Sequence, residues 1–171
     1  PELIFGHLLT STNYNEKTLK HVGGKNGYGA KLTNIFSKQF YVETCDGKNI
    51  FKQTFYDNMS RKDAPIIKKS KGNQYTLIKY IPDYSKFKID GLSDNMIRIM
   101  EKRAYDVAAC ANLATISFND EKLNIKSFKD YVNMYIDDDT EQYYEKINNR
   151  WEVDVCLNDD QVFEPISFVN G

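Results

Sequence analysis

The sequence predicts an α+β fold, a two-layer sandwich in which helices pack on one antiparallel sheet. Three alternating runs bounded by turn residues are typical of half-buried strands: Phe40 to Thr44, Phe51 to Tyr56 and Tyr75 to Ile81. Because the links between these runs are short, we expect an antiparallel meander. Helical periodicity before and after the strands supplies the second layer.

The helices are predicted from apolar residues that recur at helical spacing. A first helix ends at the hydroxyl-rich run from Thr10, and its apolar face is Leu3, Ile4, Leu8 and Leu9. A second runs from Gly27 to Phe36, with a stripe made of Tyr28, Leu32, Ile35 and Phe36. A long helix from about Ser93 to Ala111 has an apolar side formed by Leu92, Met96, Met100, Ala104, Val107 and Ala111.

The remaining elements suggest a boundary within the chain. A short strand at Thr115 to Phe118, a turn at Asn119-Asp120 and a helix from about Ser127 to Tyr135 complete the first unit. Asp137-Asp138-Asp139 is typical of a solvated linker, so we expect one domain over residues 1–136 and the start of another over 137–171. Beyond it, we expect two strands joined through Asn158-Asp159-Asp160, namely the alternating run Trp151 to Leu157 and the run Phe163 to Val169.

Composition narrows the function without fixing it. The 171 residues are 41% hydrophobic and 13% aromatic, which is enough for a core, and the start at Pro1 without Met suggests an excised piece. No stretch approaches the roughly 18 apolar residues of a membrane span, so we expect no membrane partner. Net charge is −1, and the lysines at 68, 69 and 71 are interpreted as a solvated hairpin loop beside Gly72. We therefore expect DNA contacts, if there are any, to lie elsewhere.

Cysteine and histidine indicate no metal or redox chemistry. Cys45, Cys110 and Cys156 are widely spaced and odd in number, which favours free thiols in an intracellular, reducing compartment. We expect Cys45 and Cys110 to behave as small buried hydrophobes. His7 and His21 have no acid or nucleophile at catalytic spacing, so packing or loop roles are expected.

The most specific motif is a glycine-rich loop that leads into the second helix, Gly24-Lys25-Asn26-Gly27-Tyr28-Gly29-Ala30-Lys31-Leu32. Closely spaced glycines let main-chain N–H groups turn toward a phosphate, and the helix N-terminus adds its own. A Walker A loop would need Lys directly after the last glycine, where Ala30 stands, and a Rossmann fingerprint would need a small residue at Leu32. The loop therefore predicts a different polyphosphate cradle. Residues 10–26 have no apolar period and are interpreted as a lid-like loop.

At this loop the chain resembles a known family, eukaryotic-type DNA topoisomerase II, within the gyrase, heat-shock chaperone, histidine kinase and MutL mismatch-repair ATPase superfamily. The resemblance begins with Pro1-Glu2-Leu3-Ile4-Phe5-Gly6 and the loop, and continues in the same order nearly to the end. The later matching segments are Phe51-Lys52-Gln53-Thr54, Pro82-Asp83-Tyr84-Ser85-Lys86-Phe87, Arg103-Ala104-Tyr105-Asp106, Arg150-Trp151 and Ser167-Phe168-Val169-Asn170. It implies the C-terminal part of the superfamily's ATP-binding domain, followed by the start of a transducer domain.

The resemblance also implies roles for residues. Gly24 to Lys31 would bind the triphosphate of ATP, with main-chain N–H groups from Asn26 to Ala30 on its oxygens and Lys31 as a point charge. Ser11, Thr12 and Asn13 would hydrogen-bond the sugar and the adjoining phosphate. Lys25 stands where the family commonly has arginine, which keeps the charge but loses the bidentate fork. The implied ATP contacts are Ser11, Thr12, Asn13, Gly24, Lys25, Asn26, Gly27, Tyr28, Gly29, Ala30 and Lys31.

The resemblance further implies an ATP- and Mg²⁺-dependent isomerase of the nucleus, a homodimer whose other domains bind and cleave DNA. The superfamily's E-N-x-x-D and D-x-G-x-G motifs, which supply the water-activating Glu, the magnesium Asn and the adenine Asp, are absent, and Glu16 and Asp94-Asn95 have the wrong order. We expect those motifs before Pro1, a further phosphate-binding lysine after Gly171, and no catalytic or metal residue in the 171 residues, which alone should be inactive. Two alternatives stay open: another ATPase of the superfamily, or a non-catalytic nucleotide-binding module.

Overall fold

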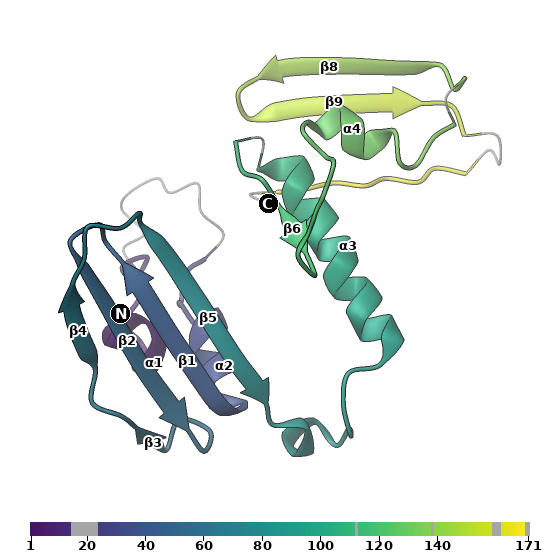
Figure 1. Cartoon of the computed structure of the whole chain (residues 1–171). Helices are drawn as coiled ribbons and strands as arrows, with labels where there is room; N and C mark the ends of the chain where they lie inside the picture. The colour runs from purple at the N-terminus through teal and green to yellow at the C-terminus, as the bar shows by residue number, and fades with distance from the viewer. Residues whose placement is uncertain (15–23, 112, 138, 159–161, 170–171) are drawn as a thin grey trace. The chain divides into compact units, whose positions relative to one another are not determined.

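The computed structural model describes residues 1–14, 24–111, 113–137, 139–158 and 162–169 (Figure 1). Most of the predicted lid, residues 15–23, lies outside the described residues. The chain divides into two compact units, Pro1–Gly91 and Leu92–Gly171, and each is described by itself. The predicted domain boundary at residue 137 stays a prediction.

The first unit is built on an antiparallel sheet whose strand order is β3-β2-β1-β5, with β4 also paired to β2. Its strands are β1 (Ser37–Cys45), β2 (Asn49–Tyr56), β3 (Arg61–Lys62), β4 (Ile66–Lys69) and β5 (Tyr75–Pro82). The expectation of a meander was wrong, because β5 pairs with β1 and not with β2. The link from β2 to β5 is not a short turn: it contains β3 and β4, which occupy the other edge of β2 and leave β1 as the partner of β5.

Polar contacts at the turn hold the register of the central hairpin. Asp46 Oδ1 accepts the main-chain N–H groups of Lys48 and Asn49, at 2.8 and 2.6 Å, in an Asx turn. Gly47 takes φ +87°, a conformation that suits glycine. The hairpin then pairs Phe40 with Phe55. The lysine cluster also differs from expectation, since the first two lysines, at positions 68 and 69, belong to the exposed strand β4 and not to a loop.

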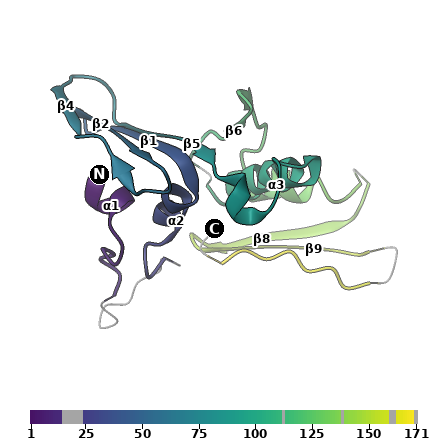
Figure 2. The same ribbon diagram turned by 90° about the horizontal axis from the view of Figure 1, so that it is seen from below.

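The core of this unit lies between the sheet and two short helices, α1 (Glu2–Gly6) and α2 (Gly29–Ile35), which lie on one face of the sheet (Figure 2). Inward-facing side chains of β1 and β2 form it: Phe40, Val42, Phe51 and Phe55. Phe5 of α1 packs against this cluster, with its ring centroid 6.0 Å from that of Phe40. Cys45 is buried at the end of β1, as predicted.

Both helices differ from their expected extents and faces. The first ends at Gly6, because His7 is extended, so Leu8 and Leu9 lie outside it. In the second, the expected stripe of Tyr28, Leu32 and Phe36 is exposed, and the buried residues are Lys31 and Asn34. These two polar residues lie three positions apart and therefore share one face of the helix. A short 3-10 helix, η1 (Tyr84–Phe87), follows β5, and its Phe87 ring lies 5.2 Å from Phe36.

The second unit contains α3 (Asp94–Cys110), the hairpin of β6 (Ser117–Phe118) and β7 (Glu121–Lys122), α4 (Phe128–Val132), and the hairpin of β8 (Gln142–Asn148) and β9 (Trp151–Cys156). Serines cap both helices: the side chain of Ser93 accepts the Met96 N–H, and that of Ser127 accepts the Asp130 N–H. The predicted turn at Asn119 and Asp120 is confirmed, with φ of 49° and 65°.

A carboxylate joins α3 to α4 in this unit. Asp106 accepts hydrogen bonds from Lys102 Nζ at 2.9 Å and from the Tyr131 hydroxyl at 2.7 Å. The Tyr131 hydroxyl also lies 2.7 Å from that of Tyr135, and its ring meets Phe168 edge-on. Burial, together with the hydrogen bonds to Tyr135 and Asp106, raises the pKa of Tyr131. The Tyr131 hydroxyl therefore stays protonated, and its hydrogen bond to Asp106 connects α4 to α3.

Two expectations for this unit were wrong. The partner of β9 is β8, joined through Asn149 and Arg150, whereas residues 162–169 have no regular secondary structure. Sequence reasoning missed β8 because its pattern does not alternate cleanly. Cys110 is exposed at the end of α3, and the buried neighbours are the two alanines before it, at positions 108 and 109.

Close contact between α1 and the core makes Gly6 sensitive to substitution. A Cβ at Gly6 would lie 2.7 Å from Cε1 of the buried Phe55 ring, which cannot move without disturbing the core. We expect Gly6→Ala to lower the free energy of unfolding by about 1–3 kcal/mol, measured by urea denaturation. Gly91→Ala is the matched control, since no atom lies within 4 Å of a Cβ there. Equal stability of the two variants would contradict this packing.

Candidate functional site

The glycine loop ends in a backbone arrangement that presents main-chain N–H groups to solvent. Gly27 has φ +67°, which places it in the left-handed region that favours glycine. Helix α2 then begins at Gly29, with Tyr28 as its N-cap. The N–H groups of a first helical turn have no partner within the helix. Residues 24–30 are all exposed, which leaves this part of the main chain accessible to a ligand.

Lys31 supports this loop from within the unit. Its side chain is only 3% exposed, and Nζ donates to the carbonyl oxygen of Gly27 at 3.0 Å. A buried ammonium group needs acceptors, because an unpaired buried charge is costly. This hydrogen bond joins α2 to the Gly27 turn, four residues earlier in the chain. It also places the positive charge of Lys31 beneath the exposed main chain of the loop. A Cβ at Gly27 would lie 3.4 Å from this Nζ, so the position has little room for a side chain.

The second predicted segment, Ser11 to Asn13, lies against the loop. Asn13 Nδ2 donates to the Gly24 carbonyl at 2.7 Å, and the Ser11 side chain accepts the main-chain N–H of Asn13 at 3.1 Å. Cβ of Ser11 would lie 3.4 Å from a Cβ on Gly27. The structure therefore places Ser11 to Asn13 next to the glycine loop, although the two segments are separated in the sequence. Thr12, Lys25 and Ala30 are exposed beside these contacts.

This arrangement fits an anionic ligand. A left-handed glycine followed by a helix start is a backbone arrangement that binds phosphates in proteins, and both features are exposed here. Lys31 adds a full positive charge beneath it. The triphosphate that the resemblance implies matches this donor set in charge and chemistry. Glycine at positions 27 and 29 would leave room for a phosphate to approach the main chain closely.

Neither a metal-binding group of side chains nor a membrane-spanning helix occurs in the part of the chain that the structure describes. Those residues contain no group of three or more His, Cys, Asp and Glu side chains that could hold a metal ion. Among the same residues, no helix has both the length and the apolar character needed to cross a bilayer.

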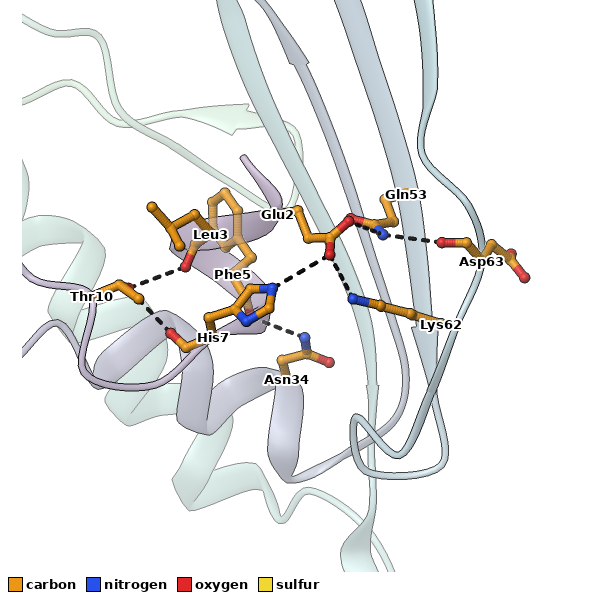
Figure 3. A network of polar contacts seen from close by, with 9 residues as sticks. All are labelled: Glu2, Leu3, Phe5, His7, Thr10, Asn34, Gln53, Lys62 and Asp63. Carbon is orange, nitrogen blue, oxygen red and sulfur yellow. Dashed lines mark hydrogen bonds and ion pairs between the residues drawn. The ribbon is translucent and has the colours of Figure 1, made fainter.

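Sequence reasoning missed several residues that hold the site in place (Figure 3). Asn34 is 1% exposed, and its Nδ2 donates to the Phe5 carbonyl of α1 at 3.0 Å. The Thr10 hydroxyl donates to the Leu3 carbonyl at 3.1 Å and also contacts that of His7. Tyr14 donates to the Asn26 carbonyl at 3.3 Å. The available signal was the helical spacing of Lys31 and Asn34, which gives α2 a polar inner face.

Solved structures resemble this chain over nearly its whole length. The ATPase and transducer domains of DNA topoisomerase II from Balamuthia mandrillaris match 99% of it and 44% of their own chain, at 44% identity and a TM-score of 0.89. The ATPase region of Saccharomyces cerevisiae topoisomerase II matches 93% of it and 43% of its own chain, at 40% identity and a TM-score of 0.84. No protein-family model matches the chain.

The fold is therefore of the α+β class found in topoisomerase ATPase regions, as the sequence predicted. Among curated relatives, DNA topoisomerase 2 of Bombyx mori is 48% identical over 181 residues and matches the whole chain. The chain belongs to the DNA topoisomerase 2 family. It spans about 12% of the length of the curated relatives. The matched relatives are topoisomerases, which favours this family over the chaperone and mismatch-repair alternative.

Gly29 offers a clean test of ligand approach to the loop. Apart from the adjoining backbone, no atom of the residues that the structure describes lies within 4 Å of a Cβ at this position, so a side chain there has room and would obstruct a ligand that approaches the main chain. We expect Gly29→Val in the full-length protein to weaken binding of a non-hydrolysable ATP analogue at least about tenfold, because the side chain keeps phosphate from the main chain. Isothermal titration calorimetry would measure the dissociation constant of the analogue.

Gly91→Val is the matched control for this variant, since its Cβ also meets no atom within 4 Å. It should bind the analogue as the unsubstituted protein does. Unchanged affinity in Gly29→Val would show that the phosphates do not approach the start of α2.

Proposed function

We propose that this chain supplies the triphosphate-binding part of the ATP site in an ATP-dependent DNA topoisomerase II. One observation carries the proposal: Lys31 is buried under a left-handed Gly27 turn, and its ammonium group reaches that turn's carbonyl at 3.0 Å. The chain's membership of the family supports the same function.

Each predicted residue has a role in this proposal. Main-chain N–H groups from Asn26 to Ala30 donate to the β- and γ-phosphate oxygens, and Lys31 supplies positive charge beneath them. Asn13 holds the Gly24 carbonyl at 2.7 Å and so keeps the loop closed on the ligand. Ser11 and Thr12 offer hydroxyls to the sugar and the adjoining phosphate. Lys25 adds charge at the exposed rim of the loop.

The wider activity follows from the family. ATP binding would close two copies of the ATPase region into a dimer gate, which captures one DNA duplex while another is cleaved in a different domain. Such closure is a shift in population driven by contacts that only the triphosphate state makes. ATP would supply the phosphoanhydride bond, and Mg²⁺, held by residues of the full-length enzyme outside this chain, would neutralise part of the phosphate charge. We place the enzyme in the nucleus, where its DNA substrate lies.

The chain's own residues do not provide the hydrolytic step. Its sequence contains neither the E-N-x-x-D nor the D-x-G-x-G motif. Asp94 and Asn95, the nearest pair, open α3 beside the Ser93 cap, where they serve the helix start. The water-activating glutamate and the adenine-binding aspartate must therefore come from other residues of the full-length enzyme.

The test compares DNA-stimulated ATP hydrolysis in the full-length protein and in two lysine variants. We expect Lys31→Met to lower kcat/KM by roughly tenfold to a hundredfold, since the positive charge beneath the phosphates and the bond that supports the Gly27 turn are lost. Lys79→Met, which removes an exposed lysine of β5, should leave kcat/KM unchanged. The 171 residues alone should show no turnover.

Three results would contradict the proposal. Turnover by the 171 residues alone, if Lys31→Met removed it, would place the hydrolytic groups inside this chain. Equal kcat/KM in the Lys31→Met and Lys79→Met variants would remove Lys31 from the site. Binding of nucleotide without any hydrolysis by the full-length protein would favour the non-catalytic module.

A further inference from the structure

A polar network outside the loop joins α1 to the sheet (Figure 3). Glu2 of α1 is at its centre. Its Oε1 accepts from Lys62 Nζ of β3 at 2.5 Å and lies 3.4 Å from His7 Nε2, and its Oε2 accepts from Gln53 Nε2 of β2 at 2.8 Å. One carboxylate thus contacts two strands and the residue that follows its own helix.

Besides its ion pair with Lys62, Glu2 accepts a hydrogen bond from the buried side chain of Gln53. Its side chain is 2% exposed and lies on the core face of β2, opposite Val42. A buried amide needs hydrogen-bond partners, and its Nε2 has two acceptors, the Glu2 carboxylate and the Asp63 carbonyl at 3.0 Å. The donors Lys62, Gln53 and His7 hold the pKa of Glu2 at about 2, so the carboxylate is ionised at neutral pH.

A five-residue helix does not hold its own position. Isolated helices of this length are unstable in water, so α1 (Glu2–Gly6) depends on what it touches. Phe5 provides the apolar contact with the core cluster. Gly6 also lies close to the Phe55 ring, and apolar contacts of this kind are not directional. The Glu2 network supplies the directional contacts that fix its orientation on the sheet.

Hydrogen bonds to main-chain carbonyls of α1 hold both parts of the nucleotide site, namely the start of α2 and the segment that contains Ser11. The Phe5 carbonyl accepts from Asn34 Nδ2, which holds α2 three residues beyond Lys31. The Leu3 carbonyl accepts from the hydroxyl of Thr10, the residue that directly precedes Ser11. A change in the orientation of α1 would therefore move the Ser11 segment and the start of α2 at once.

We propose that Glu2 is a positioning residue of the nucleotide site, which clamps α1 to β2 and β3 and so sets Ser11 and Lys31 at the spacing that the triphosphate requires. This inference rests on the proposed function. Small displacements of binding groups cost substantial affinity, because hydrogen bonds to phosphate are directional. Glu2 itself has no contact with the ligand in this account.

The experiment measures the dissociation constant of the non-hydrolysable analogue AMPPNP in the full-length protein, by calorimetry well below the melting temperature. We expect Glu2→Gln and Lys62→Met each to raise it about fivefold to tenfold. Lys52→Met is the matched control. Lys52 pairs with Glu43 at 2.9 Å on the same sheet, and Glu43 also has a pKa of about 2, set by Tyr41, Tyr75 and Lys52. This second pair lies on the strand face that points away from α1.

A double-variant cycle separates positioning from general stabilisation. If Glu2 acts through the Ser11 segment, Glu2→Gln should weaken AMPPNP binding much less in a Ser11→Ala background than in the unsubstituted protein. A purely structural role would lower the melting temperature and leave the dissociation constant of the folded protein unchanged. Full additivity in the cycle, or equal effects of Lys62→Met and Lys52→Met, would overturn the inference.

The same data separate this inference from the function on which it rests. If AMPPNP does not bind, or if Lys31→Met leaves its dissociation constant unchanged, the proposed function fails. If Lys31→Met weakens binding and Glu2→Gln does not, the positioning role of Glu2 fails alone.

Discussion

The hydrogen bond from the buried Lys31 ammonium to the Gly27 carbonyl is the interaction on which this site depends. It stabilises a turn that only glycine adopts readily, and it sets a positive charge under main-chain N–H groups. Without it, the loop would be an exposed segment ahead of a short helix. With it, the turn and the charge are already in place in the folded chain, so a ligand bound there would not bear the cost of ordering them.

The same lysine explains why α2 buries polar residues. Sequence periodicity placed Tyr28, Leu32 and Phe36 toward the core, and the structure exposes them. Apolar spacing identifies a helix but does not say which side another element covers, and here Lys31 and Asn34 face inward, where main-chain carbonyls of the loop and of α1 accept their hydrogen bonds. The buried side chains of this helix are polar, so the hydrophobic pattern misassigned its inner face.

Other parts of the fold were accessible to sequence reasoning to different degrees. The strands β1, β2 and β5 follow from alternation, and the Ser93 and Ser127 caps mark where α3 and α4 begin. Pairing was harder, because the partner of β5 depends on where the long connection after β2 goes. The ligand-binding roles of the loop residues stay predictions, which rest on a spacing of glycine and lysine that suits phosphate binding. The Glu2 to Gln53 contact spans 51 positions in the chain, and no local pattern could have indicated it.

The central claim, that main chain around Gly27 and Gly29 holds a triphosphate above Lys31, is tested most directly by a crystal structure of the full-length ATPase region with AMPPNP bound. We expect the β- and γ-phosphate oxygens at about 2.7–3.2 Å from main-chain nitrogens of this loop, with the Lys31 ammonium beside them. A triphosphate bound elsewhere, with the loop and Lys31 arranged as they are here, would contradict it.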